Sequence, residues 1–332
     1  MIVPDSRRAL DDPKWRTLRL QKVNVRMRLL VTGGAGFIGS HLVEELVAAG
    51  HDVCVLDNFT TGKMRNLSGV VCSKNLKIVR ADVRRIPGSL IRKLRRTDGV
   101  CHLAAVTDVQ ESIKNPILTS DVNLMGTLRV LEAARELKAQ RVVFASSAAV
   151  YGMIKRFPVT EDASIAPISP YGASKAASEL YCRAFEENHG IEAVSLRYFN
   201  VYGPRQISGQ YSGVISIFAR RILRGQPLTV FGDGSQSRDF VYVKDVVDAT
   251  IRALKGGFQS RMFNIGSGTE TTIGNLAETM QELVGRRPGV RFLPPRLGDP
   301  YRGVADITKT HRELGFNPRT SLKDGLSATI EW

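Results

Sequence analysis

The fold of this chain is decided by the stretch LLVTGGAGFIGS at residues 29–40. The stretch opens with an apolar run typical of a buried strand, and from Ser40 to Ala49 apolar residues recur at helical spacing. Between the two, Gly33 allows a tight turn, Gly36 lets backbone approach a pyrophosphate, and Gly39 permits close packing of helix on strand. The amide groups and the positive dipole end at the helix N-terminus attract phosphate. The stretch predicts a dinucleotide-binding turn, with a glycine turn of another kind of α/β protein as the alternative.

The acidic residue that ends the next predicted strand indicates which dinucleotide binds. Asp57 closes the strand at 53–57. A carboxylate at this place accepts hydrogen bonds from a ribose 2′-hydroxyl and repels a 2′-phosphate, so NAD is favoured over NADP. Lys63 and Arg65 follow in the loop, and we interpret them as surface charges.

Two later strand ends offer further cofactor contacts. Asp82 and Val83 follow the third predicted strand and suit a contact with adenine, or a simple cap of the strand end. Ala104 and Ala105 follow the fourth and are small enough to let backbone pass under the cofactor.

Predicted strands and helices alternate from Met27 to about Phe144. Strands are predicted at 28–32, 53–57, 76–81, 99–103 and 141–146, and helices at 37–49, 86–95 and 117–138. This alternation predicts an α/β fold with a doubly wound parallel sheet. After Leu196 the elements shorten, with helices predicted at 211–224, 244–254, 273–284 and 322–330 and strands at 228–231, 238–242, 262–265 and 290–293. We interpret this part as a smaller mixed α/β substrate lobe intertwined with the last strands of the first domain.

The composition is that of an ordinary soluble protein. The 332 residues are 43% hydrophobic and 24% charged, and a chain of this length is expected to form about two domains. Since no stretch approaches 18 apolar residues, we expect no membrane span. The four cysteines (Cys54, Cys72, Cys101 and Cys182) lack CxxC spacing. We therefore expect no metal site and a reduced, cytoplasmic setting.

The formal net charge of +15 has two interpretations. One is binding to nucleic acid or to a membrane surface. The other is a basic surface together with arginines that bind an anionic diphosphate. We favour the second and expect no nucleic-acid partner, because the basic residues are scattered and no basic run is interleaved with aromatic residues. The densest internal run, at 92–96, lies on a predicted amphipathic helix.

Residues 1–26 form a basic leader without clear strand or helix periodicity. The leader has no apolar core, which excludes a secretory signal. Its acidic residues are unusual for a transit peptide. We expect residues 1–26 to be disordered or dispensable and the folded unit to start at Met27.

A second group of residues carries chemistry. Ser169 suits the N-cap and Pro170 the first position of a helix. Tyr171 then lies in the first turn, with Lys175 at i+4 on the same face. Free tyrosine has a pKa of about 10, and a nearby ammonium and the helix N-terminus both lower it. Since Ser147 ends the preceding strand and can hydrogen-bond the same substrate hydroxyl, the pattern predicts a catalytic group, with a surface Tyr/Lys pair as the alternative.

These motifs resemble those of the extended short-chain dehydrogenase/reductases, and among them the nucleotide-sugar 4-epimerases of the UDP-glucose 4-epimerase type. The resemblance covers residues 27–332. It rests on TGGAGFIGSH (32–41), LDNFTTGK (56–63), HLAA (102–105), SSAAVYG (146–152), SPYGASKAASE (169–179), RYFNVYGPRQ (197–206), VFGDGSQSRDFVYVKDV (230–246) and GDPYRGVAD (298–306). It implies a Rossmann-type NAD-binding domain at 27–196, with parts of 197–265, and a discontinuous UDP-sugar lobe at 197–332.

The resemblance also assigns roles by position. It implies that Ser147, Tyr171 and Lys175 are catalytic and that Asn123 supports their hydrogen-bond network. The cofactor-binding residues it implies are Gly33, Gly36, Phe37, Ile38, Asp57, Asn58, Asp82, Val83, Leu103, Ala104, Ala105, Asn123, Tyr171, Lys175 and Tyr198, the last beside the nicotinamide. The substrate-binding residues it implies are Thr107, Ser147, Tyr171, Phe199, Asn200, Gln206, Thr229, Phe231, Arg238, Arg296, Asp299 and Gly303.

Within the substrate group the implied contacts are specific. Asn200, Arg238 and Arg296 match diphosphate contacts, and arginine suits that role because its planar fork binds phosphate bidentately. Asp299 matches a contact with a ribose hydroxyl. Thr229 and Phe231 match the strand that contacts uracil.

The implied reaction is 4-epimerisation of a UDP-hexose through a transient 4-keto sugar, with tightly held NAD. Dehydratases of this family carry an Asp-Glu pair after the catalytic hydroxyl, and decarboxylases a glutamate at the second position; here these are Ala148 and Ala149. Thr107 replaces a lysine of some epimerases. Gly303 replaces a bulky tyrosine that borders the sugar pocket, which predicts tolerance of UDP-GlcNAc and UDP-GalNAc unless the glycine merely serves a turn.

Three alternatives stay open. One is a UDP-glucuronate 4-epimerase. Another is a nucleotide-sugar oxidoreductase that performs net redox chemistry. A non-catalytic nucleotide-binding protein is the third, although it would be expected to lose Tyr171 or Lys175. The family resemblance further implies a homodimer through a four-helix bundle, with the helices at 117–138 and 171–189 as candidates.

Overall fold

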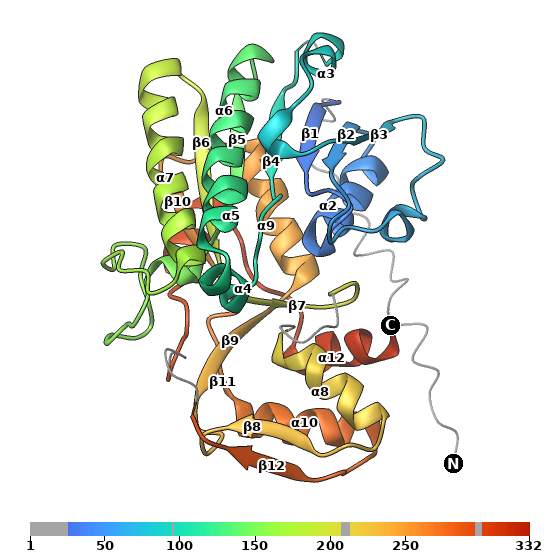
Figure 1. Cartoon of the computed structure of the whole chain (residues 1–332), viewed down its shortest axis with the longest axis vertical. Coiled ribbons are helices and arrows are strands. Elements are labelled where there is room, and N and C mark those ends of the chain that lie inside the picture. The colour runs from blue at the N-terminus through green and yellow to red at the C-terminus, as the bar shows by residue number, and fades with distance from the viewer. Residues whose placement is uncertain (1–25, 95, 207–212, 296–300) are drawn as a thin grey trace.

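A seven-stranded sheet forms the frame of the computed structural model, which describes residues 26–94, 96–206, 213–295 and 301–332 (Figure 1). Its strand order is β10-β6-β5-β4-β1-β2-β3, and every neighbouring pair is parallel. The strands are β1 (Arg28–Thr32), β2 (Asp52–Asp57), β3 (Leu76–Arg80), β4 (Gly99–His102), β5 (Arg141–Ser147), β6 (Glu192–Tyr198) and β10 (Met262–Ile265). The predicted doubly wound parallel sheet is confirmed.

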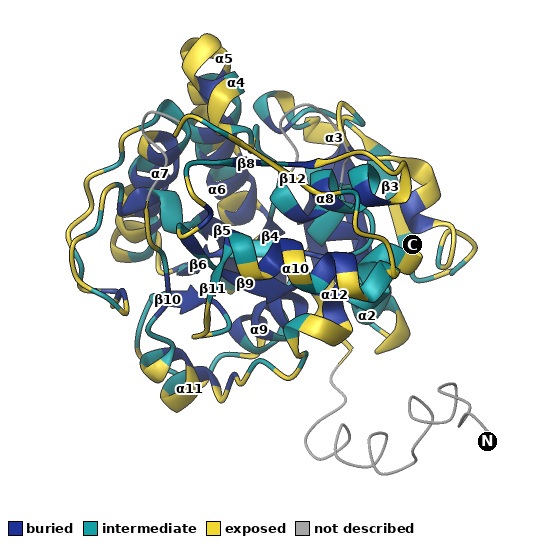
Figure 2. Ribbon diagram, turned by 90° about the horizontal axis from the view of Figure 1, so that it is seen from below, coloured by how far each residue is buried: buried dark blue, intermediate teal, exposed yellow. Residues whose placement is uncertain are grey.

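Helices cover both faces of this sheet because its strands are apolar on both faces. In β1, Leu29 and Val31 face one core cluster and Leu30 faces the other. The first cluster is covered by α2 (Phe37–Ala48), α9 (Val243–Lys255) and α11 (Thr308–Leu314), and the second by α3 (Gly88–Lys93), α6 (Gly126–Glu136) and α7 (Pro170–His189). Figure 2 shows the buried strands between these helical layers.

The helix predicted at 117–138 is interrupted. The structure divides it into α5 (Pro116–Ser120), a π-helical turn at Asp121–Met125 and α6. Such turns inside helices occur mostly at functional sites. Sequence periodicity did not reveal this turn, nor did it predict α4 (Val109–Lys114) just before it. The remaining single turns are at Met64–Leu67, Val83–Arg85 and Ala148–Val150.

A smaller lobe lies below the large sheet in Figure 1. Its three-stranded sheet has the order β11-β9-β7, with one parallel and one antiparallel pair, and β12 pairs in parallel with β8. These strands are β7 (Asn200–Tyr202), β8 (Leu228–Phe231), β9 (Ser237–Tyr242), β11 (Glu270–Thr272) and β12 (Val290–Leu293), packed with α8 (Val214–Leu223), α10 (Ile273–Val284) and α12 (Leu322–Glu331). The mixed lobe agrees with the predicted fold class, and the domain boundaries remain a prediction.

The described residues begin at Arg26, and the expected start of the folded unit at Met27 stays a prediction. Arg26 donates to Asp52 at 2.8 Å and to Asn75 at 3.1 Å. The rest of the leader, residues 1–25, lies outside the described residues. In the part of the chain that the structure describes, no helix is long and apolar enough to cross a membrane.

A buried ion pair joins the helix that carries Tyr171 to β6 of the large sheet. The Arg197 side chain on β6 is 0% exposed, and its Nε and Nη2 donate to Glu179 on α7 at 2.9 and 2.7 Å. Its Nη1 donates to the Tyr151 hydroxyl and to the Glu161 carbonyl, each at 2.9 Å. Because the Arg197 guanidinium and the Glu179 carboxylate pair with each other, neither is buried without a counter-charge.

Replacing the cation should therefore destabilise the fold strongly. Arg197→Met leaves the Glu179 carboxylate buried without its counter-charge, and we expect the free energy of unfolding to fall by about 3–5 kcal/mol. Denaturant unfolding followed by circular dichroism measures this change. Arg287→Met, which removes an exposed pair with Glu282, is the matched control and should leave the midpoint nearly unchanged. Equal midpoints for the two variants would contradict the assigned role of Arg197.

Candidate active site

The glycine turn between β1 and α2 brings three backbone segments into direct contact. Gly33 has φ +69°, and a Cβ on it would lie 2.8 Å from the Ala104 nitrogen. A Cβ on Gly39 would lie 2.1 Å from the Gly33 oxygen, so α2 packs on the turn more closely than any side chain allows. Gly36 is the N-cap of α2 and supplies no side-chain cap. The amide end of α2 is thus free of a capping side chain and suits an anionic ligand.

Asp57 lies directly against this turn. Its carboxylate is buried and accepts from the Ala35 amide at 3.0 Å and from the Phe59 amide at 2.8 Å. A Cβ on Gly62 would lie 2.8 Å from the carboxylate, so the 58–62 loop folds closely over it. Because each carboxylate oxygen has a second lone pair, Asp57 keeps acceptor capacity for a ribose hydroxyl.

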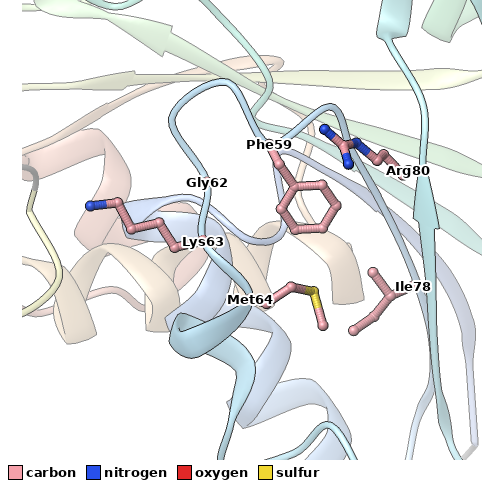
Figure 3. Close-up of a pocket in the computed structure, with 6 residues that line it drawn as sticks. All are labelled: Phe59, Gly62, Lys63, Met64, Ile78 and Arg80. Atoms are coloured by element: carbon pink, nitrogen blue, oxygen red, sulfur yellow. The ribbon is translucent and has the colours of Figure 1, made fainter.

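A pocket of about 550 Å³ lies beside this loop, lined by Phe59, Gly62, Lys63, Met64, Ile78 and Arg80 (Figure 3). The Arg80 guanidinium lies 5.9 Å from the centre of the Phe59 ring. The Lys63 amine points away from the other side chains in Figure 3. The pocket contains none of the predicted catalytic residues.

The other predicted cofactor residues lie at neighbouring strand ends. Asp82 caps the Val83–Arg85 turn by accepting from the Arg84 amide at 2.9 Å, and it also accepts from Asn58 at 3.0 Å. Hydrogen bonds from Arg84 hold the pKa of Asp82 well below its usual range. Leu103 and Ala104 donate their amides to Thr32 at 3.2 and 3.3 Å. Asp82 therefore caps the helical turn after β3, and its adenine contact stays a prediction.

Ser147, Tyr171 and Lys175 meet where β5 ends and α7 begins. Ser147 lies close enough to the Tyr171 hydroxyl to oppose the rise of its pKa, and Ser147 accepts from the Ala149 amide at 3.1 Å. Ser169 caps α7 through the Gly172 amide at 3.1 Å, and Pro170 is its first residue, as the sequence predicts. The Lys175 ammonium donates to the Ala145 carbonyl at 2.7 Å and lies 6.0 Å from the centre of the Tyr171 ring.

Burial controls the protonation of this group. It raises the pKa of Tyr171, against the opposing effect of the Ser147 hydrogen bond. It lowers the pKa of Lys175 to about 8, while Cys182 and Glu179 act in the other direction. The expected net lowering of the Tyr171 pKa is wrong for this geometry, because desolvation of the buried phenol outweighs the groups that favour the phenolate.

Asn123 in the π-helical turn forms hydrogen bonds to the loop at Val106 and to α7. Its side chain accepts from the Val106 amide at 2.8 Å and donates to the Val106 carbonyl at 2.9 Å. It also donates to Ser174 on α7 at 3.0 Å. Thr107 follows Val106 and is exposed. Asn123 thus connects the loop before Thr107 to the helix that carries Tyr171.

The predicted substrate residues divide between the end of β6 and the small lobe. Asn200 on β7 donates to the Asp239 carbonyl at 3.2 Å, and Gln206 donates to the Val201 carbonyl at 3.1 Å. Thr229 and Phe231 alternate with two buried residues on β8. The others described are Phe199 beyond β6, Arg238 on β9 and Gly303 after α10, whereas Arg296 and Asp299 lie outside the described residues.

The Tyr198 side chain extends toward α9. It is buried at the end of β6, and its hydroxyl bonds to Thr250 on α9 at 2.8 Å. Its predicted position beside the nicotinamide stays a prediction.

Sequence reasoning missed several residues that hold the site. Ser112 on α4 accepts from the Tyr171 amide at 3.2 Å, and Ser174 donates to the Tyr171 carbonyl at 2.7 Å. The signal for α4 was present, since Asp108 caps it through the Glu111 amide at 2.7 Å and the two are spaced as in a capping box. Asp239, which accepts from the Ala305 amide at 3.1 Å, lies in the motif at 230–246, in which only Phe231 and Arg238 are predicted site residues.

The residues present fit a bound dinucleotide. Close-packed glycines leave space only for backbone at the N-terminus of α2, and Asp57 offers a carboxylate at the end of the next strand. Within the described ranges, no group of three His, Cys, Asp or Glu side chains is arranged to hold a metal ion.

Comparison with known proteins agrees with this arrangement. Residues 29–266 match the NAD dependent epimerase/dehydratase family. The chain is 38% identical to the UDP-glucose 4-epimerase of Mycolicibacterium smegmatis, over 92% of this chain and 98% of that one. It is 36% identical to UDP-glucuronic acid decarboxylase 1 of Danio rerio, over 96% of this chain and 75% of that one.

Solved structures of related enzymes superpose closely. The UDP-N-acetylglucosamine 4-epimerase of Methanobrevibacter ruminantium, in complex with UDP-N-acetylmuramic acid, matches with a TM-score of 0.88 and 36% identity. The UDP-glucose 4-epimerase of Thermus thermophilus, in complex with NAD, matches with 0.83 and 40%. The UDP-glucuronic acid 4-epimerase of Bacillus cereus, with UDP-glucuronic acid and NAD, matches with 0.85 and 33%. Each match covers 92% of this chain and 98% of the other.

Proposed function

We propose that this chain, which belongs to the NAD dependent epimerase/dehydratase family, is a UDP-hexose 4-epimerase that keeps its NAD tightly bound. The observation that carries the proposal is the Ser147–Tyr171–Lys175 group at the edge of the sheet where the glycine turn also lies. NAD is the cofactor of this family, and related structures contain it. Relatives named as UDP-glucose and UDP-N-acetylglucosamine 4-epimerases support the substrate class.

In the proposed mechanism Tyr171 is the general base. Its hydroxyl, once deprotonated, removes the proton from the sugar 4-hydroxyl, and Ser147 aligns that hydroxyl by hydrogen bonding. NAD held at the glycine turn by Gly33, Gly36 and Asp57 would supply reversible hydride transfer, as acceptor of the hydride that leaves the sugar C4 and as its donor to the opposite face of the same carbon. Lys175 stabilises negative charge on the phenolate as the proton moves. Asn200, Arg238 and Arg296 bind the diphosphate, about which the sugar turns between the two transfers.

The residues after Ser147 favour epimerisation over elimination. Ala148 and Ala149 form the turn that Ser147 caps, and neither carries a group that could act as acid or base. A carboxylate there would serve dehydration or decarboxylation. The runner-up is a UDP-glucuronate 4-epimerase, supported by the related enzyme of Bacillus cereus.

An assay without added cofactor tests the proposal. We expect purified protein to convert UDP-glucose and UDP-GlcNAc to their 4-epimers without added NAD, and to leave UDP-glucuronate unchanged. Tyr171→Phe should lower turnover by roughly 10²–10⁴-fold, the usual contribution of a general base, and should still copurify with NAD. Chromatography of the products and of the released cofactor measures both. Conversion of UDP-glucuronate alone would establish the runner-up, and full turnover by Tyr171→Phe would overturn the mechanism.

We propose that Gly303 sets the width of the sugar pocket. A Cβ added there would meet nothing within 4 Å, and its φ is not in the left-handed region. The residues that follow are fixed, because the Val304 carbonyl accepts from the Val159 amide at 2.8 Å and the Ala305 amide donates to Asp239. A side chain at position 303 therefore enters open space without disturbing the backbone.

We expect Gly303→Tyr to abolish epimerisation of UDP-GlcNAc and to retain that of UDP-glucose, because the ring fills the space that the N-acetyl group needs. Gly303→Ala is the matched control and should act on both sugars. The ratio of kcat/KM for the two substrates is the measured quantity. If this ratio is unchanged in Gly303→Tyr, position 303 does not border the N-acetyl group.

We further propose a homodimer whose interface is formed by α4, α5, the π-helical turn and α7. Large apolar side chains are exposed on neighbouring elements there: Ile113 on α4, Ile117 and Leu118 on α5, Met125 in the π-helical turn, and Leu180 and Tyr181 on α7. Figure 2 shows α4 and α5 projecting from the molecule with exposed residues. A second copy would cover this apolar face, and neighbouring exposed apolar side chains are a feature of protein–protein interaction sites.

A charge placed on this face should separate the copies. Leu180, 66% exposed, becomes buried in the proposed dimer, so Leu180→Arg is expected to give a monomer in sedimentation equilibrium. Leu223→Arg on α8, also at an exposed site, is the control and should sediment as the wild type does. A wild-type monomer would refute the dimer.

The four cysteines are free, which supports a cytoplasmic setting.

A further inference from the structure

His102 is a buried titratable residue that the proposed mechanism does not use. It ends β4, directly before Leu103 and Ala104, and is 2% exposed. Both ring nitrogens have partners: Nδ1 lies 2.7 Å from the Thr32 hydroxyl on β1, and Nε2 lies 3.0 Å from the Thr127 hydroxyl on α6. The ring therefore connects the strand that leads into the glycine turn with the helix that follows the π-helical turn.

The partners of the two threonines determine which ring nitrogen carries the proton. The Thr127 hydroxyl donates to the Asn123 carbonyl, which can only accept. The nearby Ser178 hydroxyl uses its own proton on the Ser174 carbonyl at 2.8 Å. Thr127 must therefore accept from His102, so the imidazole proton is on Nε2. Nδ1 is then bare and accepts from Thr32.

The hydrogen bonds consequently run in one direction from β1, which leads into the glycine turn, to α7, which carries Tyr171. The Ala104 amide donates to Thr32, Thr32 to His102, His102 to Thr127 and Thr127 to the Asn123 carbonyl. The chain continues through the Asn123 side chain to Ser174, which donates to the Tyr171 carbonyl at 2.7 Å. Every polar atom in this series has a partner. A doubly protonated His102 would have to donate from Nδ1 to Thr32, which reverses the bond that Thr32 donates here.

We infer that His102, as a neutral imidazole protonated on Nε2, is a positioning residue that fixes the catalytic helix relative to the cofactor strand. It contacts neither substrate nor reacting atoms. It acts through Thr127, which holds the backbone of the turn that carries Asn123. This inference rests on the proposed function for its catalytic consequence, but the tautomer and the hydrogen-bond series are properties of the fold.

Two substitutions at position 102 distinguish the hydrogen bonds made by the two ring nitrogens. Gln at position 102 can place an N–H near the Nε2 position and keep the bond to Thr127, whereas Asn can only reach the Thr32 side. We expect His102→Gln to keep kcat close to the wild-type value and His102→Asn to lower kcat roughly 10- to 100-fold, as misplacement of catalytic groups by about 1 Å does. KM for the UDP-sugar and copurified NAD should stay unchanged in both.

Thr127 supplies the rescue control. Thr127→Val removes the acceptor and should match His102→Asn, and Thr127→Ser, which restores the hydroxyl, should recover wild-type kcat. Equal loss in His102→Gln and His102→Asn, or no loss in either, would overturn the positioning role. So would a failure of Thr127→Ser to recover what Thr127→Val loses.

A spectroscopic measurement tests the tautomer without any assay. The chain has five histidines, so ¹⁵N-histidine labelling gives few signals, and the His102 pair is the one absent from His102→Gln. We expect its shifts to report an Nε2–H neutral ring at neutral pH. An Nδ1–H tautomer or an imidazolium overturns the inference even if the enzyme is a 4-epimerase. The expected tautomer in a protein without epimerase activity would instead refute only the proposed function.

Discussion

The structure depends on the contact between two backbones at the start of α2. Gly39 packs so closely on Gly33 that a single added carbon would lie 2.1 Å from a carbonyl oxygen. This contact holds the helix axis over the end of β1 and directs its uncapped amides to one point. Asp57 and the loop behind it then close around the same point through the Ala35 and Phe59 amides. The place of the proposed NAD site, and of the groups proposed to act on the cofactor, follows from this steric constraint.

The sequence predicted those elements whose formation depends on local pattern. The strands at 228–231, 262–265 and 290–293 and the helix at 273–284 have the predicted bounds, because apolar periodicity and flanking turn residues define them. The catalytic arrangement followed for a similar reason: Ser169, Pro170, Tyr171 and Lys175 lie within two turns of one helix, where spacing fixes geometry.

Features that depend on distant contacts could not be predicted in this way. The π-helical turn at Asp121–Met125 places the Asn123 side chain on both polar groups of Val106, and periodicity alone gives a continuous helix there. The direction of the Tyr171 pKa shift depends on how deeply the phenol is buried and on which hydroxyl lies beside it. Neither quantity is encoded in spacing. The same holds for Arg197, whose partners come from four separate segments.

The late position of α9 and β10 in the chain has a consequence for biosynthesis. α9 covers one face of the large sheet, where Val31, Val143 and Leu196 lie, and β10 adds its edge strand beyond β6. A ribosome therefore delivers six strands of the sheet before α9 and α11, which complete the cover that α2 begins on this face, and before the strand that completes this edge. The nascent chain carries an apolar face and an open strand edge during that interval, which are the features that molecular chaperones protect.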